Sequence, residues 1–299
     1  MNQPFEIPSH CTLCPRRCGA DRRSGEPGLC GGGGALRVAR AAPHFWEEPC
    51  VSGKNGSGCV FFAGCSLGCV YCQNYGISVG DGGKTVSVER LAEIFRELEA
   101  QGVHNLNLVT GTHYAPWIRA ALELARPSVP VVWNTGGYET LEAVDGWAGY
   151  VQVYLPDLKY LDPARSARYS AAPDYFTAAL AAVRRMTAQT GPVELDENGL
   201  IRRGVIVRHM PLPHGKDDSL ALLEALARAV PPDRILLSLL RQYVPCGRAA
   251  DYPEINRRLS SYEYDRVVRR AAELGFRGYT QERDSADSAY TPAFDGTGV

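Results

Sequence analysis

The sequence predicts an α/β protein: a partial (βα)6 barrel with a small Cys-rich N-terminal extension. From residue 59 onward, six short apolar runs alternate with stretches of helical period, the order that folds into a parallel sheet covered by helices. The chain has 299 residues, 45% of them apolar and 22% charged, which is enough for one large core. Eight units would need more chain, so six units indicate a barrel that is open on one side.

Residues 1–58 differ in composition from the rest of the chain. They are rich in Gly, Pro and Arg and have little apolar periodicity. The stretches CGGGGALRVAR (30–40) and VSGKNGSG (51–58) are typical of loops. We therefore expect residues 1–58 to form a metal-binding extension and residues 59–299 to form the barrel with a C-terminal tail.

Each predicted strand is a short apolar run, as expected for strands that are buried on both faces of a parallel sheet. The six runs are 59–63, 105–110, 129–135, 151–159, 205–211 and 235–240. A further hairpin is predicted over 193–204, with Asn198 and Gly199 at its turn.

The predicted helices lie between these runs and have apolar residues at helical spacing. They cover 87–102, 115–126, 139–148, 174–191, 217–230 and 260–276. Ser87 occupies an expected helix N-terminus. Ser260 followed by Glu263 has the spacing of a capping box.

The charge and the apolar runs exclude several classes of protein. The formal net charge is −1, so no general basic field attracts nucleic acid. No apolar run is long enough to span a membrane, and the start of the chain lacks the pattern of a secretory signal. We therefore expect a cytoplasmic protein, in which ten cysteines favour metal binding over disulfides.

Three of these cysteines follow the first predicted strand within eight residues. Cys65, Cys69 and Cys72 have the spacing C-x3-C-x2-C and fall on the first βα loop, where barrels of this kind place their active sites. Three thiolates that hold a [4Fe–4S] cluster leave one iron open to bind a substrate or cofactor. The alternatives are three buried structural cysteines, or a zinc site completed by a distant residue.

The loop GCSLGCVYCQN resembles that of the radical S-adenosylmethionine (SAM) superfamily, whose signature is C-x3-C-x2-C on the first loop of a βα barrel. Its flanks are CTLCPRRCG, GLC and HFWEEPCVSGKNGSG, and the chain ends in YTQERDSADSAYTPAFDGTGV. These stretches resemble the branch of the pyruvate formate-lyase activating enzymes, and more closely a homologue group of that branch. The resemblance extends over nearly the whole chain and implies the radical SAM type of partial barrel.

The resemblance also implies a reaction and its partners. The open iron binds the amino and carboxylate groups of SAM, and one electron from the cluster cleaves the C–S bond to give methionine and a 5′-deoxyadenosyl radical. That radical abstracts hydrogen from a substrate, either a glycine of a partner enzyme, as in the glycyl-radical activases, or a peptide; small molecules are also substrates in this superfamily. A flavodoxin or ferredoxin would donate the electron.

The resemblance further assigns residues to SAM. Tyr71 lies between two cluster ligands, where family members have an aromatic side chain near the adenine. Thr110 and Thr112 stand at the end of the second strand, where the family has a Gly-Gly-Glu stretch that contacts the SAM amino group. Because no acid is present here, the two threonines would act through backbone or hydroxyl groups.

The other assignments come from later strands. Asp157 and Lys159 match a D-x-K stretch near SAM, and Asn134 stands where an aspartate is common. Arg208 matches an arginine that faces the site. Gln242 lies near a position that is His in the activating enzymes.

Four more cysteines are close together near the N-terminus. Cys11, Cys14, Cys18 and Cys30 have the spacing C-x2-C-x3-C-x11-C, and four thiolates in one short segment can close a tetrahedral zinc site or hold a second iron–sulfur cluster. The remaining three, Cys50, Cys59 and Cys246, are interpreted as ordinary small apolar residues.

Two functions of other classes remain open from the residues alone. An iron–sulfur protein could act as a redox sensor or binding protein without cleaving SAM, and a zinc-only protein could serve as an interaction module. The repeated βα units and the polar residues at strand ends favour an enzyme, because a module needs neither.

Overall fold

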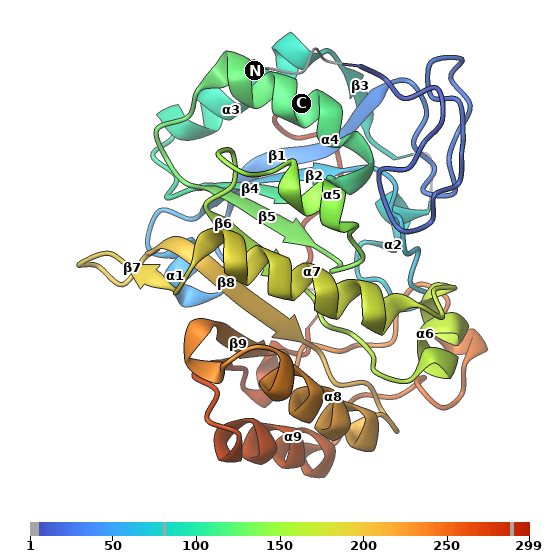
Figure 1. The fold of residues 1–299 in the computed structure, drawn as a ribbon, viewed down its shortest axis with the longest axis vertical. Coiled ribbons are helices and arrows are strands. Elements are labelled where there is room, and N and C mark those ends of the chain that lie inside the picture. Colours follow the sequence, from blue (N-terminus) through green and yellow to red (C-terminus); the bar gives the residue numbers. More distant parts are fainter. Residues whose placement is uncertain (1–5, 80–81, 288–289) are drawn as a thin grey trace.

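The computed structural model describes residues 6–79, 82–287 and 290–299, and its centre is one curved sheet (Figure 1). The strands follow the order β10-β9-β8-β6-β5-β4-β2-β1-β3, with β7 paired to β8. Their bounds are β1 Leu36–His44, β2 Ser57–Phe62, β3 Lys84–Val86, β4 Leu106–Val109, β5 Val131–Thr135, β6 Val153–Pro156, β7 Glu194–Leu195, β8 Ile201–His209, β9 Leu236–Leu239 and β10 Gly278–Thr280.

The order and direction of the strands confirm the predicted fold class. Neighbours from β2 through β4, β5, β6, β8 and β9 to β10 are all parallel. All six predicted strands are present, as β2, β4, β5, β6, β8 and β9. In the described residues β3 and β10 end the path of paired strands without pairing to each other, so the barrel is open. The predicted hairpin is present as β7 and β8.

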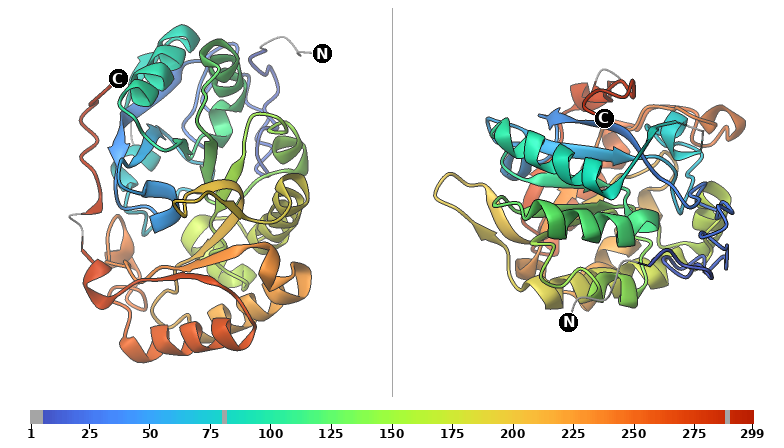
Figure 2. Two further views of the ribbon diagram at one scale, coloured as in Figure 1. Left: turned by 90° about the vertical axis from the view of Figure 1, so that its left-hand side faces the viewer. Right: turned by 90° about the horizontal axis from the view of Figure 1, so that it is seen from above.

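The longer helices cover the convex side of this sheet (Figures 1 and 2). The helices are α1 Pro49–Ser52, α2 Tyr75–Ser78, α3 Val88–Ala100, α4 Ala115–Ala125, α5 Leu141–Asp145, α6 Pro163–Ser170, α7 Tyr175–Thr190, α8 Lys216–Ala229 and α9 Ser261–Glu273. In α3, Leu91, Ile94, Phe95 and Leu98 are buried, which is one helical face against the sheet. At α9 the predicted capping box between Ser260 and Glu263 is present.

Strand β1 corrects the prediction that residues 30–40 are loop. It runs antiparallel to both β2 and β3 and joins the N-terminal segment to the main sheet. Its residues LRVARAAPH contain three alanines, which have little strand preference, so pairing with β2 and not local sequence determines its conformation. Strands β3 and β10 and helix α6 were also not predicted. The domain boundary at residue 58 stays a prediction.

The described residues of the C-terminal tail, 281–287 and 290–299, lie over the open side of the barrel between β10 and β1 (Figure 2). At its end, Gly296 N–H donates to the Ala39 carbonyl at 3.1 Å, and Ala41 N–H donates to the Thr297 carbonyl at 2.9 Å. The Phe294 and Phe61 rings lie 5.4 Å apart between centroids. The tail therefore covers the side that the sheet leaves open.

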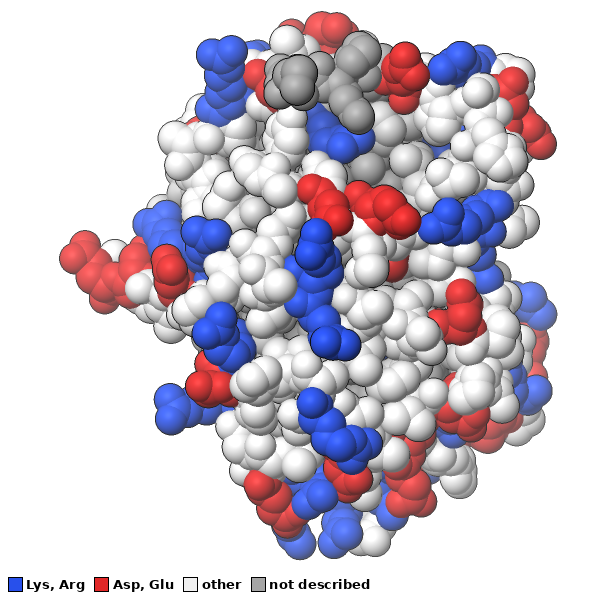
Figure 3. Space-filling view, viewed as in Figure 1, with Lys and Arg blue, Asp and Glu red and all other residues white. Residues whose placement is uncertain are grey.

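The surface agrees with the small net charge. On the face drawn in Figure 3, Lys and Arg are interspersed with Asp and Glu. Among the described residues, none of the helices has the length and apolar character that crossing a membrane requires.

Candidate active site at the carboxyl ends of the strands

The three cysteines of the C-x3-C-x2-C loop share one cavity. The loop follows β2 directly, so it lies at the carboxyl ends of the parallel strands. Cys65, Cys69 and Cys72 all line a cavity of about 530 Å³, a volume that suits a cofactor-sized molecule. Cys246, outside the loop, donates its thiol hydrogen to the Tyr71 carbonyl at 3.1 Å.

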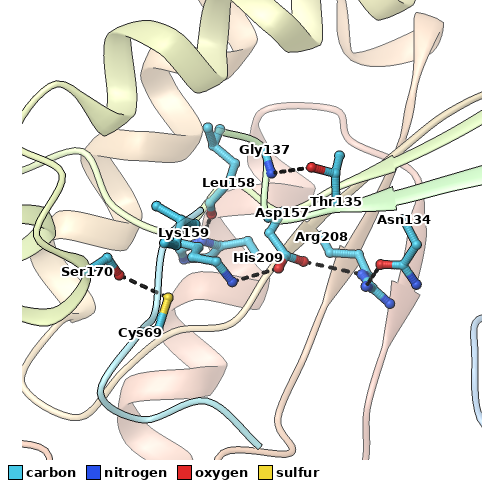
Figure 4. Close-up of polar contacts among 12 residues, drawn as sticks. Cys69, Asn134, Thr135, Gly137, Asp157, Leu158, Lys159, Ser170, Arg208 and His209 are labelled. Carbon is cyan, nitrogen blue, oxygen red and sulfur yellow. Dashed lines mark hydrogen bonds and ion pairs between the residues drawn. The ribbon is translucent and has the colours of Figure 1, made fainter. Parts of the chain in front are cut away.

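A chain of hydroxyl groups orients one of these sulfurs. The Ser170 hydroxyl donates to Cys69 Sγ at 3.0 Å (Figure 4). Tyr160 Oη lies 2.8 Å from the Ser170 hydroxyl and 2.6 Å from Tyr71 Oη. All four side chains are buried. Hydrogen bonds of this kind fix the orientation of metal ligands in proteins. The contacts of Cys69 are therefore those expected of a metal-binding cysteine.

The chemistry of the three thiols fits an iron–sulfur cluster. Burial raises the pKa of Cys65, and it raises the pKa of Cys72 to about 12, so bare thiolates are unfavourable in this cavity. A cluster supplies the positive charge that stabilises them. Within the described part of the chain, no three Cys, His, Asp or Glu side chains are already gathered around one point, so the thiols would converge when a cluster binds.

Arg208 on β8 connects three strands and a loop beside the cysteines. Its Nη1 donates to Glu47 Oε2 at 2.9 Å, and its Nε donates to Asp157 Oδ1 at 3.3 Å. Its Nη2 donates to Asn134 Oδ1 at 2.5 Å (Figure 4). Lys159 Nζ completes the network by donating to Asp157 Oδ2 at 2.6 Å.

These groups keep their charges although they are buried. Burial alone would raise the pKa of Asp157, but Lys159 and Arg208 outweigh it and lower that pKa below the ordinary value. Burial alone would lower the pKa of Lys159, and the Asp157 carboxylate reverses the shift. The cavity wall thus presents fixed charges of both signs, which an amino acid's ammonium and carboxylate groups require.

The structure brings most of the predicted SAM-binding residues together. Seven of them line the same cavity as the cysteines: Tyr71, Thr110, Asn134, Asp157, Lys159, Arg208 and Gln242. Thr112 is not among the lining residues. Its hydroxyl instead donates to the buried Glu139 carboxylate, which also accepts from Thr135 and Trp133. Thr112 therefore belongs to a buried polar cluster of which Thr135, and not Thr112 or Glu139, lines the cavity.

Four acidic residues that line the cavity were not predicted: Glu47, Glu48, Glu282 and Asp284. Glu47 and Glu48 lie on the turn between β1 and α1. The Glu48 carboxyl is buried, and burial raises its pKa. Their position depends on β1, which carries the turn to the strand ends. In the sequence, the only sign of these two residues is the stretch EEP (47–49), which falls within the predicted N-terminal extension.

The N-terminal cysteines are not among the residues that line the cavity, and one of them, Cys30, contacts its cysteine loop. Among residues 11–30, Cys11, Cys14 and Cys30 are buried and Cys18 is half-buried. Cys65 N–H donates to the Cys30 carbonyl at 3.0 Å. Gly64, at φ +90°, lets the two segments approach, because a Cβ there would overlap that carbonyl oxygen.

This contact leads to a prediction for Gly64→Ala. The substitution should lower the free energy of unfolding by about 1–3 kcal/mol, the cost of a strained backbone conformation, and should lower the iron content per chain. Urea unfolding and iron analysis would measure both. Gly76→Ala in α2 is the control, since a Cβ there meets nothing within 4 Å. Equal urea midpoints for the two variants would show that the contact is unimportant.

Comparison with known proteins agrees with this site. Residues 59–195 match the family model described as the radical SAM superfamily. The chain is 27% identical over 274 residues to "Uncharacterized protein MJ0674" of Methanocaldococcus jannaschii, covering 87% of this chain and 73% of that protein.

A similar solved structure is SuiB of Streptococcus suis bound to S-adenosylmethionine, with a TM-score of 0.43 and 15% identity. The similarity covers 73% of this chain and 45% of that one, so the chain spans less than half the length of SuiB. The segment that matches the family model, residues 59–195, begins within β2 and includes the cysteine loop and strands β4, β5 and β6. The chain is therefore similar to the radical SAM superfamily over residues 59–195.

Proposed function

We propose that the chain is a radical SAM enzyme that abstracts a hydrogen atom from a peptide or protein substrate, in the manner of a glycyl-radical activase. The observation that carries the proposal is one cavity lined by Cys65, Cys69 and Cys72 together with the charged pair Asp157 and Lys159. A [4Fe–4S] cluster on these thiolates would supply the electron that cleaves SAM to methionine and a 5′-deoxyadenosyl radical. The substrate class follows from the resemblance to the activating enzymes.

The charged residues would bind and orient SAM. Asp157 and Glu47 offer carboxylates to its ammonium group, and Lys159 and Arg208 offer cations to its carboxylate. Because all four are already held in one hydrogen-bonded network, little ordering is required on binding. The Tyr71 ring also lines the cavity and would bound the space for the adenine.

The tail would separate the reaction from bulk water. Residues 281, 282, 284, 285 and 290–292 line the cavity, opposite the sheet. The Tyr290 ring lies 4.7 Å from the Trp46 ring between centroids, which joins the tail to the turn that carries Glu47. A reactive radical needs such an enclosure to avoid side reactions. A substrate would therefore enter as a single narrow segment, which suits a peptide or a loop.

Substitution of the charged pair tests SAM binding. Asp157→Ala and Lys159→Ala should each weaken SAM binding by about 10- to 100-fold, the value of a charge-assisted hydrogen bond, without lowering the iron content. Equilibrium dialysis against SAM measures the affinity. Lys216→Ala, a surface substitution on α8 away from the cavity, is the matched control. Affinities within twofold of the control would remove the pair from the SAM site.

The substrate class requires a separate experiment. The full chain, reconstituted anaerobically with iron, sulfide, SAM and a reductant, is incubated with deuterated cell extract divided into protein, peptide and small-molecule fractions. Deuterium in 5′-deoxyadenosine from the protein or peptide fraction is expected. Deuterium from small molecules alone would contradict the substrate class but leave SAM cleavage standing. A loaded cluster that gives no 5′-deoxyadenosine would favour a redox sensor.

A further inference from the structure

The backbone of residues 6–35 folds back on itself around the four N-terminal cysteines, although in the described residues their thiols, like those of the loop, are not gathered around one point. Cys11 N–H donates to the Ala20 carbonyl and Gly19 N–H donates to the Cys11 carbonyl, both at 3.1 Å. This pairing folds residues 11–20 back on themselves, so Cys11 lies beside the turn that carries Cys18. At Gly28, a Cβ would lie 3.2 Å from Cys18 Sγ and 3.5 Å from Cys30 Sγ.

A second observation is an incompletely paired cation next to these sulfurs. The Arg22 side chain is fully buried, with Nε donating to the Gly33 carbonyl at 2.7 Å and Nη1 lying 3.9 Å from Cys11 Sγ. Its Nη1 also donates to the His113 carbonyl at 3.2 Å, and its guanidinium carbon lies 5.4 Å from the centroid of the Trp117 ring. Its Nη2 has no hydrogen-bond partner within the described residues, and no carboxylate is among the partners found there for the guanidinium. A buried cation without an anion is strongly unfavourable.

The unpaired Nη2 of Arg22 lies close to the turn that carries Cys30. A Cβ at Gly32 would lie 2.8 Å from Nη2, and the Gly32 N–H donates to Cys30 Sγ at 3.4 Å. The free end of the guanidinium therefore lies at the turn that carries Cys30. Four thiolates around a divalent metal, or around an iron–sulfur cluster, carry net negative charge, which is the counterion that Arg22 lacks.

The segment also needs a stabilising element other than a core. In the described residues before β1 there is no helix or strand, and Leu29 is 74% exposed. Segments of this size without a core are usually held by a disulfide or a metal. All four cysteines are free thiols in the structure.

We infer that Cys11, Cys14, Cys18 and Cys30 bind one metal centre through four thiolates, with Arg22 as its charge partner. The site is closed, so it serves structure or electron transfer and not SAM binding. Through the Cys30 carbonyl and the Cys65 N–H it also supports the loop of the SAM cluster. The inference does not depend on the substrate proposed above, and zinc and an iron–sulfur cluster share the required ligand chemistry.

Metal analysis of the full chain tests the inference. In the Cys65→Ala/Cys69→Ala/Cys72→Ala variant, reconstituted with iron, sulfide and zinc and then desalted, one centre should remain. About four irons per chain would identify a cluster, and about one zinc would identify a tetrahedral site. Adding Cys14→Ser and Cys30→Ser should remove it, whereas adding Cys50→Ala should not. A folded triple variant without metal would overturn the inference.

Alkylation of the native chain covers the case in which these variants do not fold. Iodoacetamide followed by peptide mass spectrometry should label Cys11, Cys14, Cys18 and Cys30 only after a chelator is added, all four together. Cys50 should stay unlabelled in both conditions, because it is buried by the fold itself. Equal labelling of the four with and without the chelator would overturn the inference.

The role of Arg22 can be tested separately by measuring how fast a chelator removes the metal. Arg22→Met should release the metal to a chelator about 10- to 100-fold faster than the native chain does, the usual effect of losing an outer partner of a metal site. Arg22→Lys should restore much of the retention because it restores the charge. Identical release rates for Arg22→Met and the native chain would contradict the role of Arg22 as charge partner.

Discussion

Replacement of any one of Cys65, Cys69 and Cys72 by alanine is expected to reduce 5′-deoxyadenosine production to background. Each thiol lines the same cavity, and residues 64–75 contain no other cysteine and no histidine that could replace a lost ligand. Loss of an outer partner of a metal site costs 10- to 100-fold, so loss of a ligand should cost more than about 100-fold. Chromatography of SAM products after anaerobic reconstitution with a reductant measures this.

The control for this prediction is Cys50→Ala, which removes a buried thiol that lies outside both cysteine groups. That variant should bind iron and cleave SAM as the native chain does. Iron content should fall with activity in the three loop variants. Full product formation by any of them would exclude a cluster held by this loop.

Arg208→Met is expected to lower the free energy of unfolding by about 3–5 kcal/mol, the cost of breaking a buried ion pair. The substitution preserves side-chain volume but leaves the carboxylates of Glu47 and Asp157 without the guanidinium that both contact. Urea unfolding at neutral pH gives the free energy. Arg202→Met is the matched control on the same strand: half of the Arg202 side chain is exposed to solvent, and the expected loss from breaking its pair with Asp196 is at most about 1 kcal/mol.

The pH dependence distinguishes a charge effect from a packing effect. The pKa of Asp157 is lowered in the folded state, so its ionisation stabilises the fold above its ordinary value of 3.8 and ceases to do so as the pH falls through the folded value. The difference between Arg208→Met and the native chain should therefore shrink below about pH 4. A difference that is constant with pH would mean that Arg208 acts by packing alone.

The repeating units were visible in the sequence because burial of a parallel sheet leaves a local pattern. Strands such as β5 and β8 are apolar runs, and α3 and α9 repeat apolar residues at helical spacing with a capping serine. Both signals come from residues that are neighbours in the chain. The cysteine loop was visible for the same reason, since three ligands occupy one loop.

Strand β1 shows where local pattern ends. Its alanines and arginines do not favour a strand, and pairing with β2 and β3 makes it one. The consequence reaches the cavity, because β1 ends at the turn that holds Glu47 against Arg208. An ion pair between residues 161 positions apart has no local signal.

Thr112 is the opposite case, a residue of suitable type at a strand end that turns away from the cavity. The Glu139 carboxylate is buried and accepts the Thr112 hydroxyl, together with Thr135 and Trp133. Because an unsatisfied buried carboxylate is costly, Glu139 determines where that hydroxyl points.

The sequence by itself determined the βα repeat, the cysteine loop and the strand ends on which Asp157, Lys159 and Arg208 stand, because these depend on periodicity and short spacing. Only the tertiary structure decided that Glu47 and Glu48 enter the cavity, that the tail covers the open side, and that Cys30 meets the loop of Cys65. Those contacts join segments distant in the chain, and they form because buried charges and backbone groups require partners, wherever in the sequence the partners lie.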